Sequence, residues 1–202
     1  MPYPSKTSRQ AILDTALLIL ERDGVGAVSM RTIAATLHLA PNALYRYYSD
    51  HNTLLAAIGN EGMRQLLEAQ RGAVDPGPVT LDTIRNVAFA YLSFARQHRA
   101  LYQIIMVKHQ VADEYLTSYA ELDSFTFNLL RQIVGESIAL EAGVALWGYL
   151  HGMISIEQLD LYREGKPRSS IEFGLNALLA GIMQVKTTDL SSSAHAPEET
   201  PL

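Results

Sequence analysis

The stretch SMRTIAATLHLAPNALYRYYSDHNTLL, residues 29–55, decides the fold of this chain. Ser29 is a good N-cap, because its hydroxyl can accept a hydrogen bond from an amide in the first helical turn. Val28 and Ile33 stand at the two positions of a hydrophobic staple around that cap. The pattern therefore predicts a short helix that begins after Ser29 and ends near Leu37.

A second short helix is predicted over residues 41–48. Pro41 suits its first position, where a missing amide proton costs nothing. Two short helices with a tight connection are the arrangement of a helix-turn-helix, whose second helix enters the DNA major groove by its N-terminal end. Spacing alone is weak evidence for DNA binding, since many helical proteins contain such pairs.

Helices are also expected on both sides of this pair. The first runs over about residues 6–23, and Gly24 is placed to end it as a left-handed C-terminal cap. Ser49 and Asp50 are capping residues for a longer helix that extends to about Arg71. The pair is thus predicted to lie between two longer helices.

The segment GAVDPGP, residues 72–78, is the clearest linker in the chain. Apolar residues recur at helical spacing beyond it, and no segment alternates as a strand would. Further helices are predicted at 80–97, 99–109, 112–134, 139–163 and 168–186. From Thr187 to Leu202 the composition turns to Ser, Thr, Pro and Glu, which predicts a disordered tail.

The fold class is therefore all-α, with an N-terminal three-helix helix-turn-helix domain and a C-terminal helical domain. The predicted domains are residues 1–55 with a connecting helix at 51–71, residues 72–186, and the tail at 187–202.

Composition bounds the possible functions. Charged residues make up 18% of the chain and apolar residues 48%, which is typical of a folded globular protein. The absence of cysteine excludes a disulfide framework and cysteine-ligated zinc. No apolar run approaches the length of a membrane span, and residues 1–10 lack the apolar core of a signal peptide. We expect a soluble, cytoplasmic protein.

The net charge of -5 is unusual for a protein that binds phosphates, but its distribution is uneven. Up to residue 55 there are five Lys and Arg against four Asp and Glu, so the remainder carries 11 of the 16 cations and 17 of the 21 anions. This asymmetry fits a basic DNA-binding domain on an acidic body.

The motif around these helices resembles the N-terminal signature of TetR-family regulators, over about residues 6–60. The family pattern has a Thr/Arg-x-Ile-Ala-x-x-Leu helix, a recognition helix of the form Leu-Tyr-x-His/Tyr-Phe/Tyr, and a Ser-x-Lys-x-x-Leu-Leu helix start. The resemblance implies a small domain core, formed here by Ile33, Ala34, Leu37, Leu39, Leu44 and Tyr48.

It also implies DNA-contacting positions. Pro41, Asn42 and Ala43 would form the exposed first turn of the recognition helix, with Asn42 the first choice for base readout. Arg46 would reach a guanine or only the backbone, and both remain open. Tyr45 and Tyr47 resemble tyrosines that contact phosphates, although packing is the alternative for one of them. Arg31 and Thr32 begin the preceding helix, and Lys6 and Arg9 would supply an N-terminal arm.

Two positions depart from the family pattern. His51 stands where a phosphate-binding lysine is usual, so operator affinity is expected to rise as the pH falls toward about 6. Ala40 stands where a Ser or Thr cap is common, which removes a contribution of about 1 kcal/mol from the recognition helix. DNA is expected to complete the ordering of that helix.

The C-terminal part contains WGYLHG, residues 147–152, which resembles the Trp/His/Gly motif of one class of TetR-family C-terminal domains. A ligand-binding and dimerisation domain is implied. Candidate lining residues of an effector pocket are Phe94, Tyr102, Met106, Tyr119, Phe125, Trp147 and His151, although core packing is the alternative for each aromatic residue and for His151.

A homodimer is expected, because two recognition helices about 34 Å apart can bind successive major grooves. Candidate interface residues, chosen for small size or helical spacing, are Tyr149, Met153, Ile156, Gly174, Ala177, Leu178 and Gly181, with packing inside the chain as the alternative.

The sequence thus predicts a ligand-responsive repressor that binds palindromic operator DNA and an unidentified small organic effector. No cofactor and no metal ion are expected, and no phosphate-binding loop or nucleophile motif points to an enzyme. The remaining alternative is a helical interaction protein that has lost DNA binding.

Overall fold

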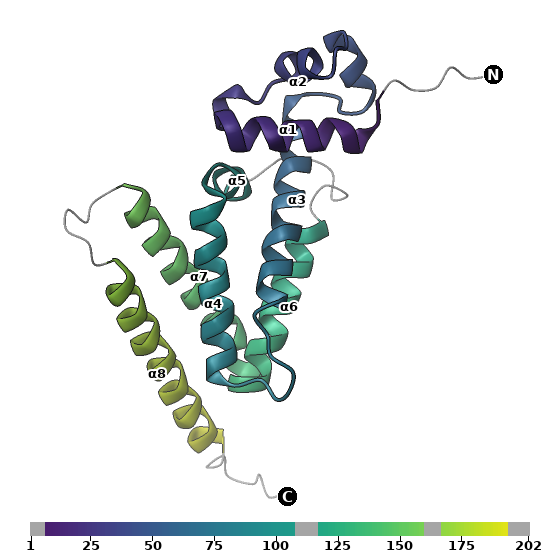
Figure 1. The fold of residues 1–202 in the computed structure, drawn as a ribbon. Coiled ribbons are helices and arrows are strands. Elements are labelled where there is room, and N and C mark those ends of the chain that lie inside the picture. Colours follow the sequence, from purple (N-terminus) through teal and green to yellow (C-terminus); the bar gives the residue numbers. More distant parts are fainter. Residues whose placement is uncertain (1–6, 108–116, 160–166, 194–202) are drawn as a thin grey trace, which may run out of the picture. The chain divides into compact units, whose positions relative to one another are not determined.

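The computed structural model describes residues 7–107, 117–159 and 167–193 (Figure 1). Every regular element in these ranges is a helix, as predicted for an all-α chain. The chain divides into two compact units, one formed by residues 1–71 and 93–123 and the other by residues 72–92 and 124–202. Unit 1 thus includes a segment, residues 93–123, that the sequence assigned to the C-terminal domain.

Unit 1 begins with α1 (Arg9–Asp23), whose N-cap is Ser8. The Ser8 hydroxyl accepts a hydrogen bond from the Ala11 amide at 3.1 Å, so the helix starts three residues later than predicted. Gly24 ends α1 with a φ of 82°, and its amide donates to the Leu20 carbonyl at 2.9 Å. Its ψ of 178° lies outside the left-handed helical region, so Gly24 ends the helix without forming the predicted left-handed cap.

A short 3₁₀ turn, η1 (Val25–Ala27), leads into α2 (Met30–Thr36). Ser29 is the N-cap of α2, since its hydroxyl accepts from the Thr32 amide at 3.0 Å. Both staple residues, Val28 and Ile33, are buried. The start of this helix was therefore predicted correctly from its capping chemistry.

The connection after α2 contains His38, a non-glycine residue with a φ of 55°. The His38 amide donates to the Ala35 carbonyl at 3.1 Å and the Leu39 amide to the Ala34 carbonyl at 2.8 Å. These two bonds define a Schellman motif with His38 at C′, the position that usually holds glycine. The motif turns the chain sharply before the next element.

The predicted recognition helix is shorter than expected and is a 3₁₀ helix, η2 (Pro41–Arg46). Ala40 precedes it and provides no side-chain hydrogen bond. Without a cap, the first turn closes through the Ala43 amide on the Ala40 carbonyl at 2.9 Å, an i→i+3 bond of poorer geometry than the α-helical one. Local interactions therefore define this element weakly.

The long helix α3 (His51–Arg71) has the bounds that the sequence predicted. Asp50 caps it, since its carboxylate accepts from the Thr53 amide at 2.7 Å. Within unit 1, α1 packs on α2, α3 and the short helix α5 (Arg99–Ile105). A Cβ on Gly62 of α3 would lie 2.9 Å from carbons of Leu101 and Ile105, so glycine allows α3 and α5 to pack closely.

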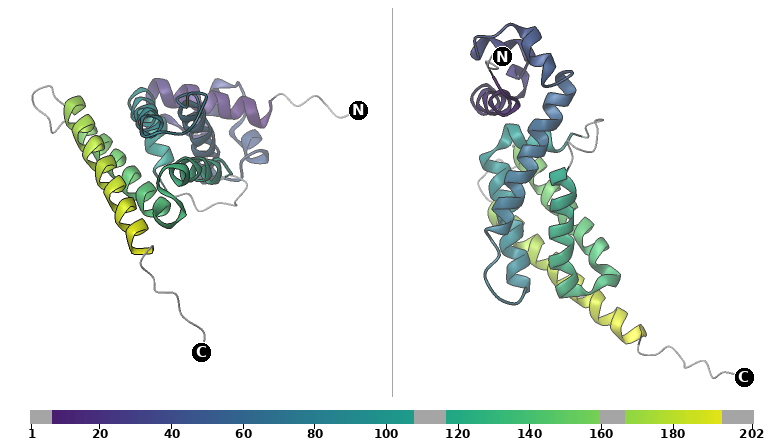
Figure 2. Two further views of the ribbon diagram at one scale, coloured as in Figure 1. Left: turned by 90° about the horizontal axis from the view of Figure 1, so that it is seen from below. Right: turned by 90° about the vertical axis from the view of Figure 1, so that its right-hand side faces the viewer.

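Two further helices, α4 (Leu81–Gln97) and α6 (Thr117–Val134), each contribute residues to both units. In unit 2, α7 (Glu136–Gln158) and α8 (Pro167–Ser193) lie side by side and run in opposite directions (Figures 1 and 2). The prediction of disorder from Thr187 is wrong up to Ser193, because α8 continues through that segment. Extending an existing helix by one residue costs far less than starting one, so a Ser/Thr-rich end can remain helical. Residues 194–202 of the predicted tail lie outside the described ranges.

None of the helices in the described ranges is long and apolar enough to cross a membrane.

Candidate nucleic-acid interface

Two buried side chains orient η2 on unit 1. Leu44 is fully buried and Tyr48 is 1% exposed, whereas Pro41, Asn42 and Arg46 are exposed. Ala43 is half-buried. Pro41, Asn42 and Arg46 are thus accessible to solvent, whereas the core positions Leu44 and Tyr48 anchor this segment to unit 1.

The other predicted core residues follow the same division. Ile33 and Ala34 are fully buried, whereas Leu37 and Leu39 are half-buried. The α2–η2 pair therefore has a core of its own.

Cations and hydroxyls also occur at the end of η2 and at the start of α2. The Arg46 guanidinium lies 5.6 Å from the centroid of the Tyr47 ring, which supports the long side chain beside the element. Arg31 is exposed in the first turn of α2. The Thr32 hydroxyl lies 2.7 Å from the Ser29 hydroxyl, so it takes part in the cap of α2. Arg31 is accordingly better placed than Thr32 to meet a phosphate.

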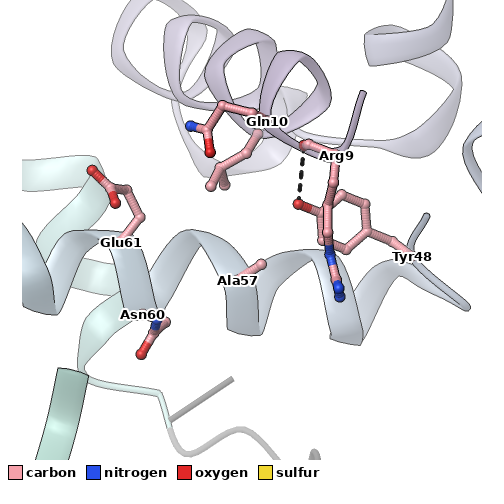
Figure 3. Close-up of a pocket in the computed structure, with 7 residues that line it drawn as sticks. Arg9, Gln10, Tyr48, Ala57, Asn60 and Glu61 are labelled. Carbon is pink, nitrogen blue, oxygen red and sulfur yellow. Dashed lines mark hydrogen bonds between the residues drawn. The ribbon is translucent and has the colours of Figure 1, made fainter. Parts of the chain in front are cut away.

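The three tyrosines of η2 and its C-terminal end differ in their contacts. Tyr45 is 49% exposed. The Tyr47 hydroxyl donates to the Thr7 carbonyl at 2.8 Å. The Tyr48 hydroxyl donates to the Arg9 carbonyl at 3.2 Å, as Figure 3 shows. Tyr47 thus makes a contact within unit 1, as the packing alternative expects, and Tyr45 is the most exposed of the three tyrosines.

Arg9 is the first residue of α1 and not part of an arm as predicted. Its guanidinium lies 5.0 Å from the centroid of the Tyr48 ring. Burial raises the pKa of the Tyr48 hydroxyl, so this group stays protonated and remains a hydrogen-bond donor at neutral pH. Lys6, the other residue of the predicted arm, lies outside the described ranges.

His51 also contacts the rest of unit 1. Its Nε2 lies 3.0 Å from the Val28 carbonyl, and because a carbonyl only accepts, Nε2 is the donor. In the neutral ring Nδ1 then carries no proton and can only accept a hydrogen bond. The rise of operator affinity at lower pH stays a prediction from the sequence.

A pocket of about 280 Å³ lies between α1 and α3 in unit 1 (Figure 3). It is not among the predicted sites, because its wall combines two helices that are far apart in the sequence. The lining residues are Arg9, Gln10, Leu13, Tyr48, Ala57, Asn60 and Glu61. The pKa of Glu61 is lowered mainly by its hydrogen bond with Arg64, so this carboxylate is ionised and paired at neutral pH.

The predicted effector-pocket residues are divided between the two units. In unit 1, Phe94 and Tyr102 are buried, Met106 is half-buried, and the Tyr119 hydroxyl donates to the Ile105 carbonyl at 3.2 Å. Burial raises the pKa of Tyr119 to about 12, so it acts only as a neutral phenol.

In unit 2, Phe125 is half-buried, whereas Trp147 is 52% exposed and stacks on His151 with a ring-centroid distance of 5.6 Å. Trp147 thus lies on an exposed side of α7, at the surface of unit 2, and not in a buried pocket.

The predicted dimer residues also fall into two groups. Tyr149 contacts Gly174 within the chain, and its hydroxyl donates to the Ile171 carbonyl at 2.9 Å, so intrachain packing accounts for both. Met153, Ile156 and Leu178 are half-buried, and Ala177 and Gly181 are exposed.

A more exposed apolar surface lies elsewhere on α7. Leu140, Val144 and Trp147, here called the α7 stripe, are 56%, 57% and 52% exposed. Their i, i+4, i+7 spacing places them on one side of the helix. Phe173 on α8 is 77% exposed. The spacing of the α7 stripe is visible in the sequence, but α7 is apolar on several sides, so spacing alone did not identify it.

Comparison with known proteins shows which family has this architecture. Residues 12–58 match the family model described as bacterial regulatory proteins, tetR family, and residues 84–178 match a tetracyclin repressor-like C-terminal domain. The chain is 21% identical over 178 residues to the uncharacterized HTH-type transcriptional regulator YobS of Bacillus subtilis, covering 87% of this chain and 93% of YobS.

Solved structures share the fold. A possible TetR family transcriptional regulator from Streptomyces coelicolor aligns with a TM-score of 0.68 and 22% identity, over 88% of this chain and 100% of that one. ActR of Streptomyces coelicolor in complex with (S)-DNPA aligns with a TM-score of 0.68 and 18% identity, over 89% and 98% of the two chains.

Proposed function

The chain belongs to the TetR family of transcriptional regulators, and on this basis we propose that it is a repressor that binds palindromic operator DNA as a homodimer and is released by a small organic effector. The observation that carries the DNA-binding part is the exposed first turn of η2, with Asn42 and Arg46 outward and Leu44 buried beneath. Such a repressor acts on the chromosome, so we place it in the cytoplasm.

Asn42 is the proposed base-contacting residue, since an amide can pair with adenine in the major groove. Arg46 contacts either a guanine or the backbone, and Arg31 and Tyr45 are proposed to contact phosphates. His51 is a further candidate for a phosphate contact. If cationic side chains of each protomer neutralise about three or four phosphates, the slope of log affinity against log salt is near -5 to -7 for the dimer.

Selection of genomic fragments by the purified protein, followed by sequencing, tests this proposal and provides the operator. Asn42→Ala and Arg46→Ala should lower the affinity for the operator more than that for random DNA if these residues contact bases. Arg71→Ala is the matched control, because Arg71 lies at the other end of α3, about 30 Å along the helix from His51. A salt slope near zero on the best fragment would exclude the proposed DNA binding.

The α7 stripe is the proposed dimer surface, together with Phe173. Its three side chains are all more than half exposed in the single chain, and a second copy is the partner that a two-fold operator requires. A Cβ at Gly148, Gly152 or Gly181 would meet open space in the single chain, which leaves room for a close helix approach.

Sedimentation tests this surface. Val144→Glu should yield monomers, because a dimer would bury an unpaired charge. Gln132→Glu adds the same charge on an exposed position of α6 and should leave the dimer intact. A dimer of unchanged mass in the Val144→Glu protein would place the interface elsewhere.

The effector is proposed to be a small, largely apolar organic molecule. Support comes from ActR, which has been solved in complex with (S)-DNPA, and from the buried aromatic residues Phe94 and Tyr102. An effector that releases DNA must bind the DNA-incompetent conformation more tightly, with a coupling of about 1 to 3 kcal/mol that lowers operator affinity about 5- to 150-fold. Saturating operator must then weaken effector binding by the same factor, and unequal factors would refute this linkage.

A further inference from the structure

The recognition element η2 is short, and its own hydrogen bonds do not determine its position. It contains six residues, it is a 3₁₀ helix, and Ala40 gives it no side-chain cap. A helix of this length is unstable by itself, since nucleation is unfavourable and few bonds follow it. Its orientation must therefore come from contacts with the rest of unit 1.

Two such contacts join the end of η2 to the beginning of α1. The Tyr47 hydroxyl donates to the Thr7 carbonyl at 2.8 Å, and the Tyr48 hydroxyl donates to the Arg9 carbonyl at 3.2 Å. Both acceptors lie at the N-terminal end of α1, Thr7 just before the N-cap and Arg9 at the first helical position, about 40 residues away in the sequence. The Arg9 guanidinium, 5.0 Å from the Tyr48 ring centroid, adds a third contact at the same place (Figure 3).

The two hydroxyls differ in their surroundings. Tyr48 is 1% exposed and its phenol is desolvated, so its bond competes little with water. Tyr47 is half-buried, and its ring also lies beneath the Arg46 guanidinium. Thr7 precedes the N-cap Ser8, so its carbonyl lies outside the helical ladder of α1.

We propose that Tyr47 and Tyr48 are positioning residues for operator recognition. Their hydroxyls hold the C-terminal end of η2 at the N-terminal end of α1 and thereby fix the orientation in which Asn42 and Arg46 meet the DNA. This inference rests on the proposed DNA-binding function. It assigns Tyr47 a contact within the protein, where the family resemblance assigns a contact with phosphate.

Hydrogen exchange without DNA tests the inference directly. Tyr48→Phe keeps the ring and removes the hydroxyl donor. The hydrogen-bonded backbone amides of residues 43, 47 and 48 should therefore exchange about 2- to 10-fold faster. Amides in the middle of α1 and α3 should change less than twofold. An equal loss of protection throughout unit 1 would show a general loss of stability and overturn the inference.

Thr15→Val is the matched control variant. The Thr15 hydroxyl donates to the Ala11 carbonyl at 2.7 Å, so the control also removes a hydroxyl–carbonyl bond from unit 1, but one inside α1. It should leave the protection of η2 unchanged. A loss at η2 as large as that in the Tyr48→Phe protein would overturn the inference.

DNA binding supplies the second measurement, with the tightest fragment from the genomic selection and a random duplex of equal length as probes. Tyr48→Phe should lower the ratio of operator to random affinity about 2- to 10-fold with the salt slope unchanged, and the double variant Tyr47→Phe/Tyr48→Phe should lower it further.

If Tyr47 contacts a phosphate instead, Tyr47→Phe weakens binding to both DNAs equally and leaves the ratio of operator to random affinity unchanged, which overturns its assigned role. Absence of any specific fragment for the unmodified protein would contradict the proposed function, while the exchange experiment would still decide the positioning contacts.

Discussion

Replacing His38 by glycine should stabilise the protein. His38 occupies C′ of the Schellman motif at the end of α2, with a φ of 55°. Its side chain is exposed and makes no hydrogen bond to any residue that the structure describes, so the ring contributes little to offset its backbone conformation. Glycine adopts this region without a steric penalty, because it has no Cβ.

The expected gain is the difference of two effects. A left-handed conformation costs an L-residue about 1 to 2 kcal/mol, and glycine loses about 0.5 to 1 kcal/mol more conformational entropy on folding. His38→Gly should therefore raise the free energy of unfolding by about 0.5 to 1 kcal/mol. For a chain of this length the melting temperature should rise by about 1 to 4 °C.

Urea unfolding followed by circular dichroism measures this difference, with an unchanged m-value as the sign that the denatured state is the same. His38→Ala is the control, because it removes the imidazole but keeps the Cβ and hence the backbone penalty. We expect it to be no more stable than the unmodified protein. If the glycine variant is not more stable than the alanine variant, the left-handed conformation of residue 38 carries no cost and the argument fails.

Three further substitutions test packing and capping. Gly62→Ala should lower the free energy of unfolding by about 1 to 3 kcal/mol in urea, because the alanine Cβ would lie 2.9 Å from Leu101 carbons. A decrease under about 0.5 kcal/mol would show that α5 can shift to accommodate the methyl group. Gly174→Ala should lower the melting temperature, since its Cβ would overlap the Tyr149 ring, and an unchanged value would contradict that contact. The hydrogen bond from the Thr53 amide lowers the pKa of Asp50. The charged cap therefore stabilises α3 at pH values above the ordinary Asp pKa of about 3.9. This stabilisation is lost as the pH falls through the lower pKa that Asp50 has in the folded protein. Asp50→Asn should thus reduce the loss of stability as the pH falls below about 4, and equal acid sensitivity of the two proteins would refute this.

The helix boundaries that depend on local chemistry were predictable from the sequence. Ser29 and Asp50 cap α2 and α3 as expected, since a side-chain oxygen next to the first turn acts on amides only two or three residues away. Pro41 likewise begins η2. The helical type of η2 was not predictable from the sequence. Ala40 has no side-chain oxygen to cap the first turn, so no local signal distinguishes an α-helix from a 3₁₀ helix there.

The hydroxyl contacts of Tyr47 and Tyr48 could not be predicted either. The pattern of the motif identified Tyr48 as a core residue, and it is 1% exposed. Their acceptors, however, are backbone carbonyls, which exist at every residue and leave no signature in the sequence. Only the path of the chain shows that Thr7 and Arg9 are the residues that meet them.

The same limit explains the apolar surface of unit 2. Helix α7 carries apolar residues on several sides, so its periodicity permits more than one buried face. The sequence favoured the side of Tyr149 as an interface, and that residue instead packs on Gly174 of the same chain. With α8 on that side, the large apolar side chains of α7 that stay more than half exposed in the described part of the chain are those of the α7 stripe. Surface of this kind is costly to leave in water, at about 25 cal/mol for each Å². The choice of the α7 stripe as the proposed interface thus follows from which face of α7 stays exposed, and this depends on tertiary packing that spacing does not encode.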